Sequence, residues 1–552
     1  MLNKRTVFTL LGALALFFAY AWFPIVTGDL WNSPDESAAA FFATRLPVVG
    51  GEYNVPAVLV EELGGIVHPR SMNVVGGQLV PNMWLGLPWM LGVIHRATGM
   101  SADMLDIVIP IVAVLAVLAW HQVILRFSRD PKIALFAAIA LAVHPGWWYF
   151  TARGLHPNVL FVSMIIFTIY FWHVLVNNSR LAKRDMLREL TILLGGLSLG
   201  MAMFIRTNEA VWLIPVALIV IWKARKLPFR ELAAGFIGIL IPIVIMLQLN
   251  ASLFGSALTT GYSVRVDPAV ANVEQSVVGE QEEASWLMQY AFPFGIHEMN
   301  VLRNVWDFHF AFFAVWSFFA TYGLLLILFR WRTFSLKERS AMWKVGGVMA
   351  AVSLYLLVLY GSWNINDNPD PTAITIGTSY IRYWLPITVM MTPFIGYAIA
   401  TGFARGRSEA RKTILMIIWI SAMILTGIQV TFVGKDEGLL YVESHLNEFE
   451  LERSSLLSKT SETDLLIVDR SDKIVFPDRQ VVLSLRDETT YASLPLMIDA
   501  VEKTGSSLYY YGITLPQEDL DFLHKTRLAP VALKMEAVEQ IGEKTLYMFS
   551  RE

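Results

Sequence analysis

The stretch Trp31-Asn32-Ser33-Pro34-Asp35-Glu36-Ser37 follows the first apolar run of the chain and carries two adjacent carboxylates. We predict a short helix over residues 37–46, ended by Pro47, which cannot continue a helix. A carboxylate at this position can accept a proton from an incoming hydroxyl, or hold a metal ion over a phosphate. The question for this region is therefore whether its carboxylates take part in a reaction or only stabilise the helix.

The structural alternative is a helix cap. Ser33 and Glu36 have the spacing of a capping box, and Pro34 would occupy the favoured first helical position. Asp35 and Glu36 would then only complement the helix dipole. The local sequence leaves both interpretations open.

Composition places the chain in a membrane. Of its 552 residues 55% are hydrophobic and 16% charged, and the mean hydropathy is +0.51. A soluble domain would carry about a quarter charged residues. The net charge of −3 says nothing about nucleic acid, but the lack of a basic tract argues against a nucleic-acid partner. Since there is no cysteine, disulfides, thiol catalysis and cysteine-based zinc sites are excluded.

The first apolar run, residues 7–26, follows Lys4 and Arg5. It resembles a secretory signal, with Ala19-Tyr20-Ala21 as a cleavage site, but its length is near the roughly 20 residues of a span. We interpret it as an uncleaved span, and under either interpretation Asp35 lies outside. Further apolar runs cover residues 104–125, 133–150, 158–176, 190–205, 211–222, 232–249, 308–329, 345–360, 380–403 and 414–433.

The segment Leu79–Arg96 decides the topology. It contains two prolines, two glycines and two tryptophans, and it is short for a span. If it lies at the outer interface, every basic loop falls inside, in accord with the positive-inside rule. These loops are residues 126–132, 180–188, 223–230, 330–339 and 405–412. We therefore predict an interfacial helix here.

The predicted fold class is an α-helical polytopic membrane protein with about 11 transmembrane helices, outer interfacial helices and the N-terminus inside. Its transmembrane module covers residues 1–433, with outer loops at 28–102, 250–307 and 361–379. From residue 434 to 552 the composition is that of a soluble domain. Strand-like runs (LLIVD, QVVLSL, SSLYYYGI, KTLYMFS) alternate there with helical patterns at 491–503 and 517–524, which predicts a small extracytoplasmic α/β domain.

With this topology, ionisable and aromatic side chains gather at the outer ends of the spans. They are Asp35, Glu36, His68, Arg70, His156, Arg206, Glu209, His297, Tyr380 and Arg382. Arginine matches phosphate geometry, and ionisable residues at membrane depth are functional candidates.

Several of these candidates have a structural alternative. Arg206 with Glu209 has the spacing of a local ion pair, and Arg382 beside aromatic residues has the setting of an interfacial snorkelling side chain. The histidines lack the spacing of a metal site, which favours structural roles for them.

Three short motifs carry a resemblance to a family. They are Ser-Pro-Asp-Glu-Ser at residues 33–37, Trp-Tyr-x-x-x-Arg at 148–153 and Arg-Tyr-Trp-Leu-Pro at 382–386. Together with the layout of about the first 430 residues, they resemble the GT-C glycosyltransferases that use polyprenyl-phosphate sugar donors. Protein O-mannosyltransferases and aminoarabinose transferases are the relatives that the layout suggests.

The resemblance implies a catalytic role for Asp35 as base with Glu36 as its acidic neighbour. It implies an inverting transfer of a hexosyl- or pentosyl-type sugar at the outer face of the cell membrane. The donor would be a polyprenyl-phosphate-linked sugar among the membrane lipids, and the acceptor a lipid, glycan or protein. Arg70, Arg206 and Arg382 would bind the donor phosphate. His68, His156, Glu209, His297 and Tyr380 would support the site.

The sequence also departs from the family. Relatives often carry a second acidic residue between the third and fourth spans, whereas residues 153–158 contain no Asp or Glu. Metal use is therefore open, with Mg²⁺ or Mn²⁺ as the candidate cofactors. The Trp-Trp-Asp motif of oligosaccharyltransferases is absent. The alternative function is a transporter or flippase of lipid-linked glycans, which would need more polar residues deep within its spans.

Overall fold

The computed structural model describes residues 4–46, 57–175, 185–224, 227–264, 291–365, 372–402, 408–484 and 488–552, together with 288, 367, 368 and 370. Pro47, much of the predicted outer loop 250–307 and several of the basic loop residues lie outside them. The chain divides into two compact units. A helical unit comprises Met1–Val26, Asp106–Ile245 and Gln281–Val442, and a mixed unit comprises Thr27–Leu105, Met246–Glu280 and Glu443–Glu552.

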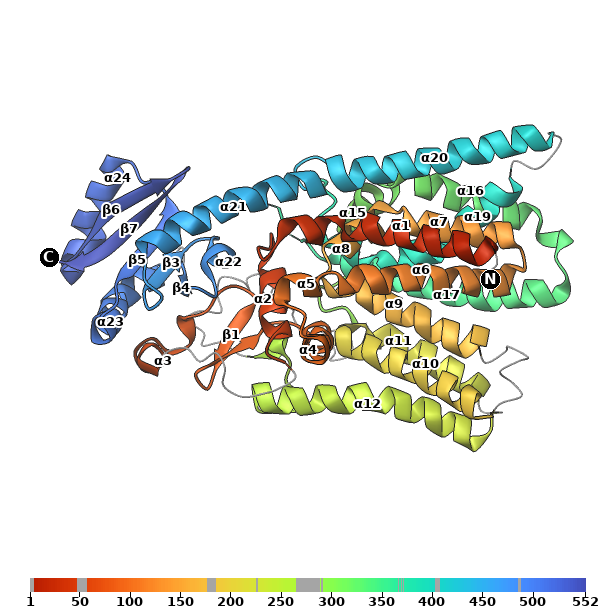
Figure 1. Cartoon of the computed structure of the whole chain (residues 1–552), viewed down its shortest axis with the longest axis horizontal. Coiled ribbons are helices and arrows are strands. Elements are labelled where there is room, and N and C mark those ends of the chain that lie inside the picture. Colours follow the sequence, from red (N-terminus) through yellow and green to blue (C-terminus); the bar gives the residue numbers. More distant parts are fainter. Residues whose placement is uncertain are drawn as a thin grey trace. The chain divides into compact units, whose positions relative to one another are not determined.

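Long apolar helices build the helical unit (Figure 1). Its main helices are α1 (Lys4–Thr27), α6 (Val108–Ser128), α7 (Pro131–Ala142), α8 (Pro145–Ala152), α9 (Pro157–Ile169), α10 (Asp185–Ile205), α11 (Ala210–Ala224), α12 (Phe229–Phe254), α15 (Glu298–Val305), α16 (Ala314–Phe329), α17 (Leu336–Ser362), α18 (Ser379–Tyr383), α19 (Leu385–Thr401) and α20 (Glu409–Val433). Each of the eleven predicted apolar runs largely coincides with one or two helices. The runs are helical because their apolar stretches carry few charges or breakers in mid-run.

The chain is a multi-pass membrane protein. Within the described ranges, six helices are long and apolar enough to cross a membrane, or eight if each of two bent pairs counts as one span. One pair, α7 with α8, bends by 53° at the break before Pro145. Two shorter apolar helices cover Pro157–His173 and Leu385–Thr401. The count of eleven and the orientation remain predictions.

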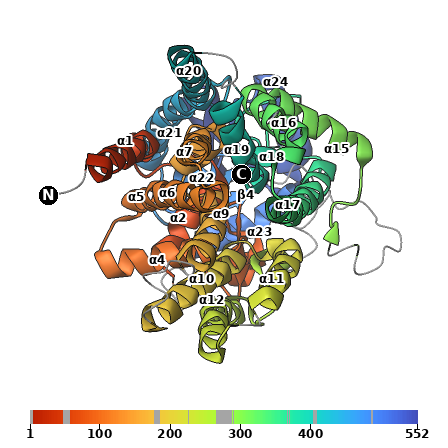
Figure 2. The ribbon, with the colours of Figure 1, turned by 90° about the vertical axis from the view of Figure 1, so that its right-hand side faces the viewer.

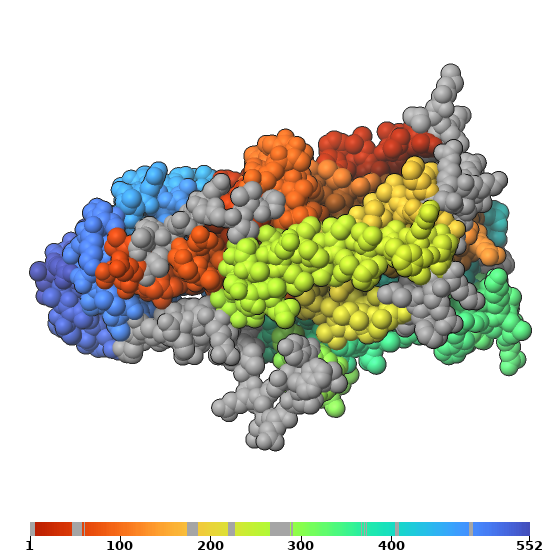
Figure 3. Space-filling view, turned by 90° about the horizontal axis from the view of Figure 1, so that it is seen from below, coloured from red at the N-terminus to blue at the C-terminus, as the bar shows by residue number. Residues whose placement is uncertain are grey.

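Small residues let the helices approach closely. In Figure 2, α19 lies amid the other helices of its unit, and it packs on α7 and α16. A Cβ added at Gly396 of α19 would lie 2.4 Å from the carbonyl oxygen of Ile133. Likewise, a Cβ at Gly196 of α10 would lie 2.2 Å from the carbonyl oxygen of Gly235 in α12. Helix α12 covers part of the face seen in Figure 3. Such contacts are typical of membrane helices, where close van der Waals packing drives association.

Most elements of the mixed unit come from two of its three segments, Thr27–Leu105 and Glu443–Glu552, which are distant in sequence. The first contributes α2 (Pro34–Ala43), α3 (Ala57–Leu63), the hairpin β1 (Met72–Val75) and β2 (Gln78–Pro81), α4 (Gly86–Thr98) and α5 (Ala102–Leu105). The second contributes most of α21 (Leu439–Lys459), then β3 (Leu465–Val468), α22 (Asp472–Val475), β4 (Gln480–Leu483), α23 (Glu488–Thr504), β5 (Leu508–Ile513), α24 (Gln517–Leu523), β6 (Leu533–Ile541) and β7 (Lys544–Arg551).

The second segment forms a five-stranded sheet of order β4-β3-β5-β7-β6. Strand β3 pairs in parallel with β4 and β5, while β7 pairs antiparallel with β5 and β6. The four predicted strand runs and both predicted helices are present. Strand β6 was not predicted because its sequence, LKMEAVEQI, is rich in helix formers. The domain boundary at residue 434 remains a prediction.

Two predicted boundaries are corrected in the first segment. Helix α2 begins at Pro34 rather than Ser37, because Ser33 and Glu36 form a complete capping box, and it ends at Ala43 rather than at residue 46. The predicted helix Leu79–Arg96 is shorter, since residues 78–81 pair with β1 across a turn at Gly76 and Gly77. Both glycines have positive φ, which suits a tight hairpin turn.

Helix α4 packs against α2, and Gly92 sets their separation. A Cβ at Gly92 would lie 1.9 Å from the carbonyl oxygen of Leu46, which is backbone and cannot rotate away. We expect Gly92→Ala to destabilise the protein by about 1–3 kcal/mol and to lower its apparent melting temperature in detergent. Gly12→Ala is the control, because nothing lies within 4 Å of a Cβ there. Equal melting of both variants would contradict the close packing of α4 on α2.

Candidate active site

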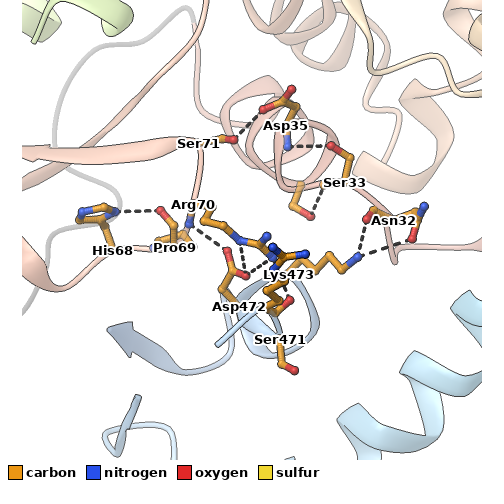
Figure 4. Close-up of polar contacts among 12 residues, drawn as sticks. Asn32, Ser33, Asp35, His68, Pro69, Arg70, Ser71, Ser471, Asp472 and Lys473 are labelled. Atoms are coloured by element: carbon orange, nitrogen blue, oxygen red, sulfur yellow. Dashed lines mark hydrogen bonds and ion pairs between the residues drawn. The ribbon is translucent and has the colours of Figure 1, made fainter. Parts of the chain in front are cut away.

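The two adjacent carboxylates make different contacts. Glu36 is 3% exposed and accepts a hydrogen bond from the backbone N–H of Ser33 at 2.9 Å, which completes the cap of α2. Asp35 is half-buried, and its Oδ1 accepts a hydrogen bond from Ser71 Oγ at 2.6 Å (Figure 4). The capping interpretation is therefore correct for Glu36, while the side chain of Asp35 is directed toward the loop before β1.

Ser71 has an unusual backbone. Its φ is +60°, in the left-handed region that costs a residue with a Cβ roughly 1–2 kcal/mol. Its carbonyl oxygen accepts a hydrogen bond from Asn82 N at 3.0 Å. Strained residues of this kind persist where the surrounding structure enforces them, and they cluster at functional sites. The strained backbone presents the hydroxyl that contacts Asp35.

The residue before Ser71 is held by a buried carboxylate. Arg70 Nε and Nη2 donate to Asp472 Oδ1 at 2.9 and 2.6 Å, and the backbone N–H of Arg70 donates to Asp472 Oδ2 at 2.9 Å. Asp472 is fully buried, and the Arg70 side chain is 23% exposed. Arg70 Nη2 also donates to the carbonyl of Arg470 at 2.8 Å. Charge-assisted contacts of this number fix the position of Arg70.

Two further contacts surround this loop. Lys473 Nζ donates to the backbone carbonyl of Asn32, just before the cap of α2, and lies 4.6 Å from the ring centroid of Phe449. His68 is buried, with its Nδ1 2.8 Å from the carbonyl of Pro69. Burial lowers the pKa of His68, against smaller raising effects from that hydrogen bond and from Asp472. His68 is therefore neutral at pH 7.

In the helical unit, Arg206 and Glu209 form a buried ion pair at the turn after α10. Arg206 Nε and Nη2 donate to Glu209 Oε1 at 3.1 and 2.9 Å. The Tyr360 hydroxyl donates to the same oxygen at 2.5 Å, and the Arg206 guanidinium lies 4.8 Å from the ring centroid of Tyr383. The local ion pair that the spacing indicated is present, and it includes Tyr360 from α17.

Two arginines form a cationic cluster around His156. Arg382 Nη1 lies 2.6 Å from His156 Nδ1, and its Nη2 donates to Ser379 Oγ at 2.7 Å. Burial, and then the positive charges of Arg382 and Arg153, lower the pKa of His156 well below its usual value. The imidazole is therefore neutral, and its Nδ1 accepts a hydrogen bond from Arg382. Arg153 in turn donates to the Tyr149 hydroxyl at 2.9 Å.

The remaining predicted residues lie near the loop between α17 and α18. Tyr380 is buried, and its hydroxyl accepts from Asn304 Nδ2 at 2.9 Å and Ile365 N at 3.2 Å. His297 precedes α15 with an exposed ring, and its backbone N–H donates to Ser362 Oγ at 3.2 Å. Across the residues that the structure describes, no group of three His, Asp or Glu side chains could hold a metal ion.

Four contact residues were not predicted as site residues: Ser71, Asp472, Tyr360 and Arg153. The first two belong to the mixed unit and the last two to the helical unit. Arg153 had a signal as the last residue of the motif Trp-Tyr-x-x-x-Arg at 148–153, and Asp472 had one because Arg470-Ser471-Asp472 follows the predicted strand LLIVD. Functional groups gather at the carboxyl ends of parallel strands.

The fold of this chain is similar to that of a protein of known structure. The crystal structure of ArnT from Cupriavidus metallidurans bound to undecaprenyl phosphate matches with a TM-score of 0.53 and 10% identity, over 99% of this chain and 98% of that one. Its apo state matches with a TM-score of 0.52 and 11% identity, over 99% and 97%. The oligosaccharyltransferase AglB from Archaeoglobus fulgidus, in complex with an inhibitory peptide and a dolichol phosphate, has a TM-score of 0.49 and 10% identity, over 98% and 74%. No family model matches, and no curated protein matches in sequence.

Proposed function

We propose that this chain, whose fold is that of the GT-C glycosyltransferases, transfers a sugar from a polyprenyl-phosphate donor to an acceptor at the outer face of the membrane. ArnT, an aminoarabinose transferase whose structure contains undecaprenyl phosphate, shares this fold over nearly the whole of both chains. The donor class is carried over from that protein as part of the proposal.

The observation that carries the proposal is the division of roles between Asp35 and Glu36. Glu36 is committed to the cap of α2, whereas Asp35 is held by a hydroxyl from another loop. A carboxylate that serves only the helix dipole needs no such partner. Asp35 is therefore the member of the pair that we assign as the general base.

The reaction would be an inverting displacement. The acceptor hydroxyl gives its proton to Asp35 as its oxygen forms a bond to the anomeric carbon, from the face opposite the phosphate. The bond between that carbon and the phosphate oxygen breaks, and the phosphate leaves with the bonding electrons and one more negative charge. Positive groups that stabilise this charge are worth about 3–4 kcal/mol each in comparable sites.

For the phosphate, we favour the cluster of Arg382, Arg153 and His156. Two positive charges lie around one neutral imidazole there, and a leaving phosphate is at least singly charged. Arg70 and Arg206 were also predicted as phosphate ligands. Arg70 pairs with Asp472 and Arg206 pairs with Glu209, and their part in phosphate binding stays a prediction.

We expect Arg382→Ala to weaken undecaprenyl phosphate binding at least tenfold, because a charge-assisted hydrogen bond contributes about 1.5–3 kcal/mol. Native mass spectrometry of the detergent-purified protein, titrated with undecaprenyl phosphate, measures this. Arg339→Ala is the control, since Arg339 donates to the backbone carbonyls of Phe334 and Arg332 before α17. Equal binding by both variants and the wild type would remove Arg382 from the donor site.

The reaction itself can be tested without knowing the sugar. If the proposal is correct, membranes from cells that lack the protein contain both the unused donor and the acceptor. Adding purified enzyme should consume one lipid-linked sugar and release the matching polyprenyl phosphate, as mass spectrometry of extracted lipids would show. We call this the lipid assay. A transporter would leave the lipid-linked sugar intact, and that result would reject the glycosyltransferase.

A further inference from the structure

Within the mixed unit, a continuous chain of contacts links Asp35 to α22, the helix between β3 and β4 of the C-terminal sheet (Figure 4). Asp472, at the start of α22, binds Arg70 through three hydrogen bonds of 2.6–2.9 Å. Arg70 precedes Ser71, and Ser71 Oγ donates to Asp35 at 2.6 Å. The buried carboxylate of Asp472 is therefore connected to Asp35 through two intervening residues.

Asp472 constrains the backbone as well as the side chain of Arg70. Its Oδ2 accepts the Arg70 backbone N–H, and its Oδ1 accepts both guanidinium contacts. On the other side of Ser71, Met72 pairs with Pro81 in the hairpin, and the Ser71 carbonyl accepts from Asn82 N. Ser71 is thus fixed from both sides, which explains how it keeps φ at +60°.

Lys473, the next residue of α22, contacts the chain that leads into α2. Lys473 donates to the backbone carbonyl of Asn32, which precedes the cap residue Ser33. Two consecutive residues, Asp472 and Lys473, therefore hold the loop that presents Ser71 and the chain that leads into α2. Asp35 lies between these two anchors in the contact network.

We infer that Asp472 and Arg70 are positioning residues that hold Ser71, and through its hydroxyl Asp35, in the orientation for proton abstraction. This inference rests on the proposed function of Asp35. It gives the C-terminal α/β segment a role in the chemical step. A misplacement of about 1 Å can cost about 100-fold in rate, because proton transfer requires close alignment.

The Ser71 hydroxyl can be tested apart from its backbone. Ser71→Gly removes the hydroxyl but adopts positive φ without strain, and Ser71→Asn keeps a hydrogen-bond donor in a residue that tolerates this conformation. In the lipid assay we expect Ser71→Gly to lower kcat about tenfold with KM and melting temperature unchanged. Ser71→Asn should recover part of that loss. Full kcat in Ser71→Gly would overturn the inference.

The anchor is tested by Asp472→Asn, with Asp478→Asn as its match. Asp478 accepts from Arg453 Nε and Nη2 at 3.1 and 2.6 Å in the same unit, without contacting Arg70 or Ser71. Both variants lose one carboxylate that binds an arginine, so both should melt earlier. We expect only Asp472→Asn to lower kcat per folded molecule, by about 10–100-fold. Equal losses in the two variants would show a purely structural role and reject the positioning inference.

The Asp35→Asn variant distinguishes a failure of the positioning inference from a failure of the proposed function. If Asp35→Asn is inactive while Ser71→Gly and Asp472→Asn match the wild type, positioning fails and the proposed function stands. If Asp35→Asn transfers sugar at the normal rate, the assignment of Asp35 as base fails first.

Discussion

Replacing Asp35 by asparagine is expected to slow sugar transfer by about 10²–10⁴-fold, the usual contribution of a positioned general base. Asparagine has nearly the same shape and can still accept the hydrogen bond from Ser71 Oγ, but it cannot take up the acceptor proton. The fold and the melting temperature should therefore change little. The lipid assay measures the rate, as release of polyprenyl phosphate over time.

Glu36→Gln is the matched control for this experiment. Glutamine also completes a capping box, so the contact with Ser33 N persists and α2 should remain intact. We expect transfer close to the wild-type rate. If Glu36→Gln were inactive and Asp35→Asn active, the roles of the two carboxylates would have to be exchanged.

Replacing Glu209 by alanine is expected to destabilise the protein by about 3–5 kcal/mol, because it leaves the buried guanidinium of Arg206 without that carboxylate. Arg206 is only 5% exposed, so water cannot replace the lost partner. The Tyr360 hydroxyl would also lose its acceptor on Glu209. Thermal unfolding in detergent can be measured as the loss of the monodisperse peak in size-exclusion chromatography. The transition temperature of Glu209→Ala should be markedly lower than that of the wild type.

Glu409→Ala is the control, because the Lys412–Glu409 pair has the same three-residue spacing. The Glu409 side chain is 83% exposed, so solvent already screens the pair and its loss should hardly change the transition. A similar shift of the transition temperature in both variants would contradict the expectation that burial increases the contribution of the Arg206–Glu209 pair to stability.

The sequence predicts the helices and strands better than the contacts between them. Apolar runs indicate the helices because burial in lipid requires a continuous apolar segment. The strand runs of the C-terminal sheet alternate or are wholly apolar, and they are found as predicted. Strand β6 fails this test, because its residues favour a helix and only pairing with β7 makes it a strand.

The candidate site could be predicted only where its contacts are local. The capping box of Ser33 and Glu36 and the pair of Arg206 and Glu209 both span three residues, so spacing alone indicates them. The contact between Ser71 and Asp35 depends on a left-handed backbone, which no residue type at that position announces. The contact between Arg70 and Asp472 depends on how distant segments fold together.

The contact between Arg70 and Asp472 can form only late in the synthesis of the chain. Arg70 and Asp472 are 402 residues apart, which a ribosome making 5–20 residues per second needs roughly 20–80 s to cover. During that interval the first loop and its carboxylate are already made, but the partner that orders them is not. If Asp35 acts as proposed, a nascent chain meets its lipid surroundings before its base is positioned, and we expect sugar transfer only after the sheet has been synthesised.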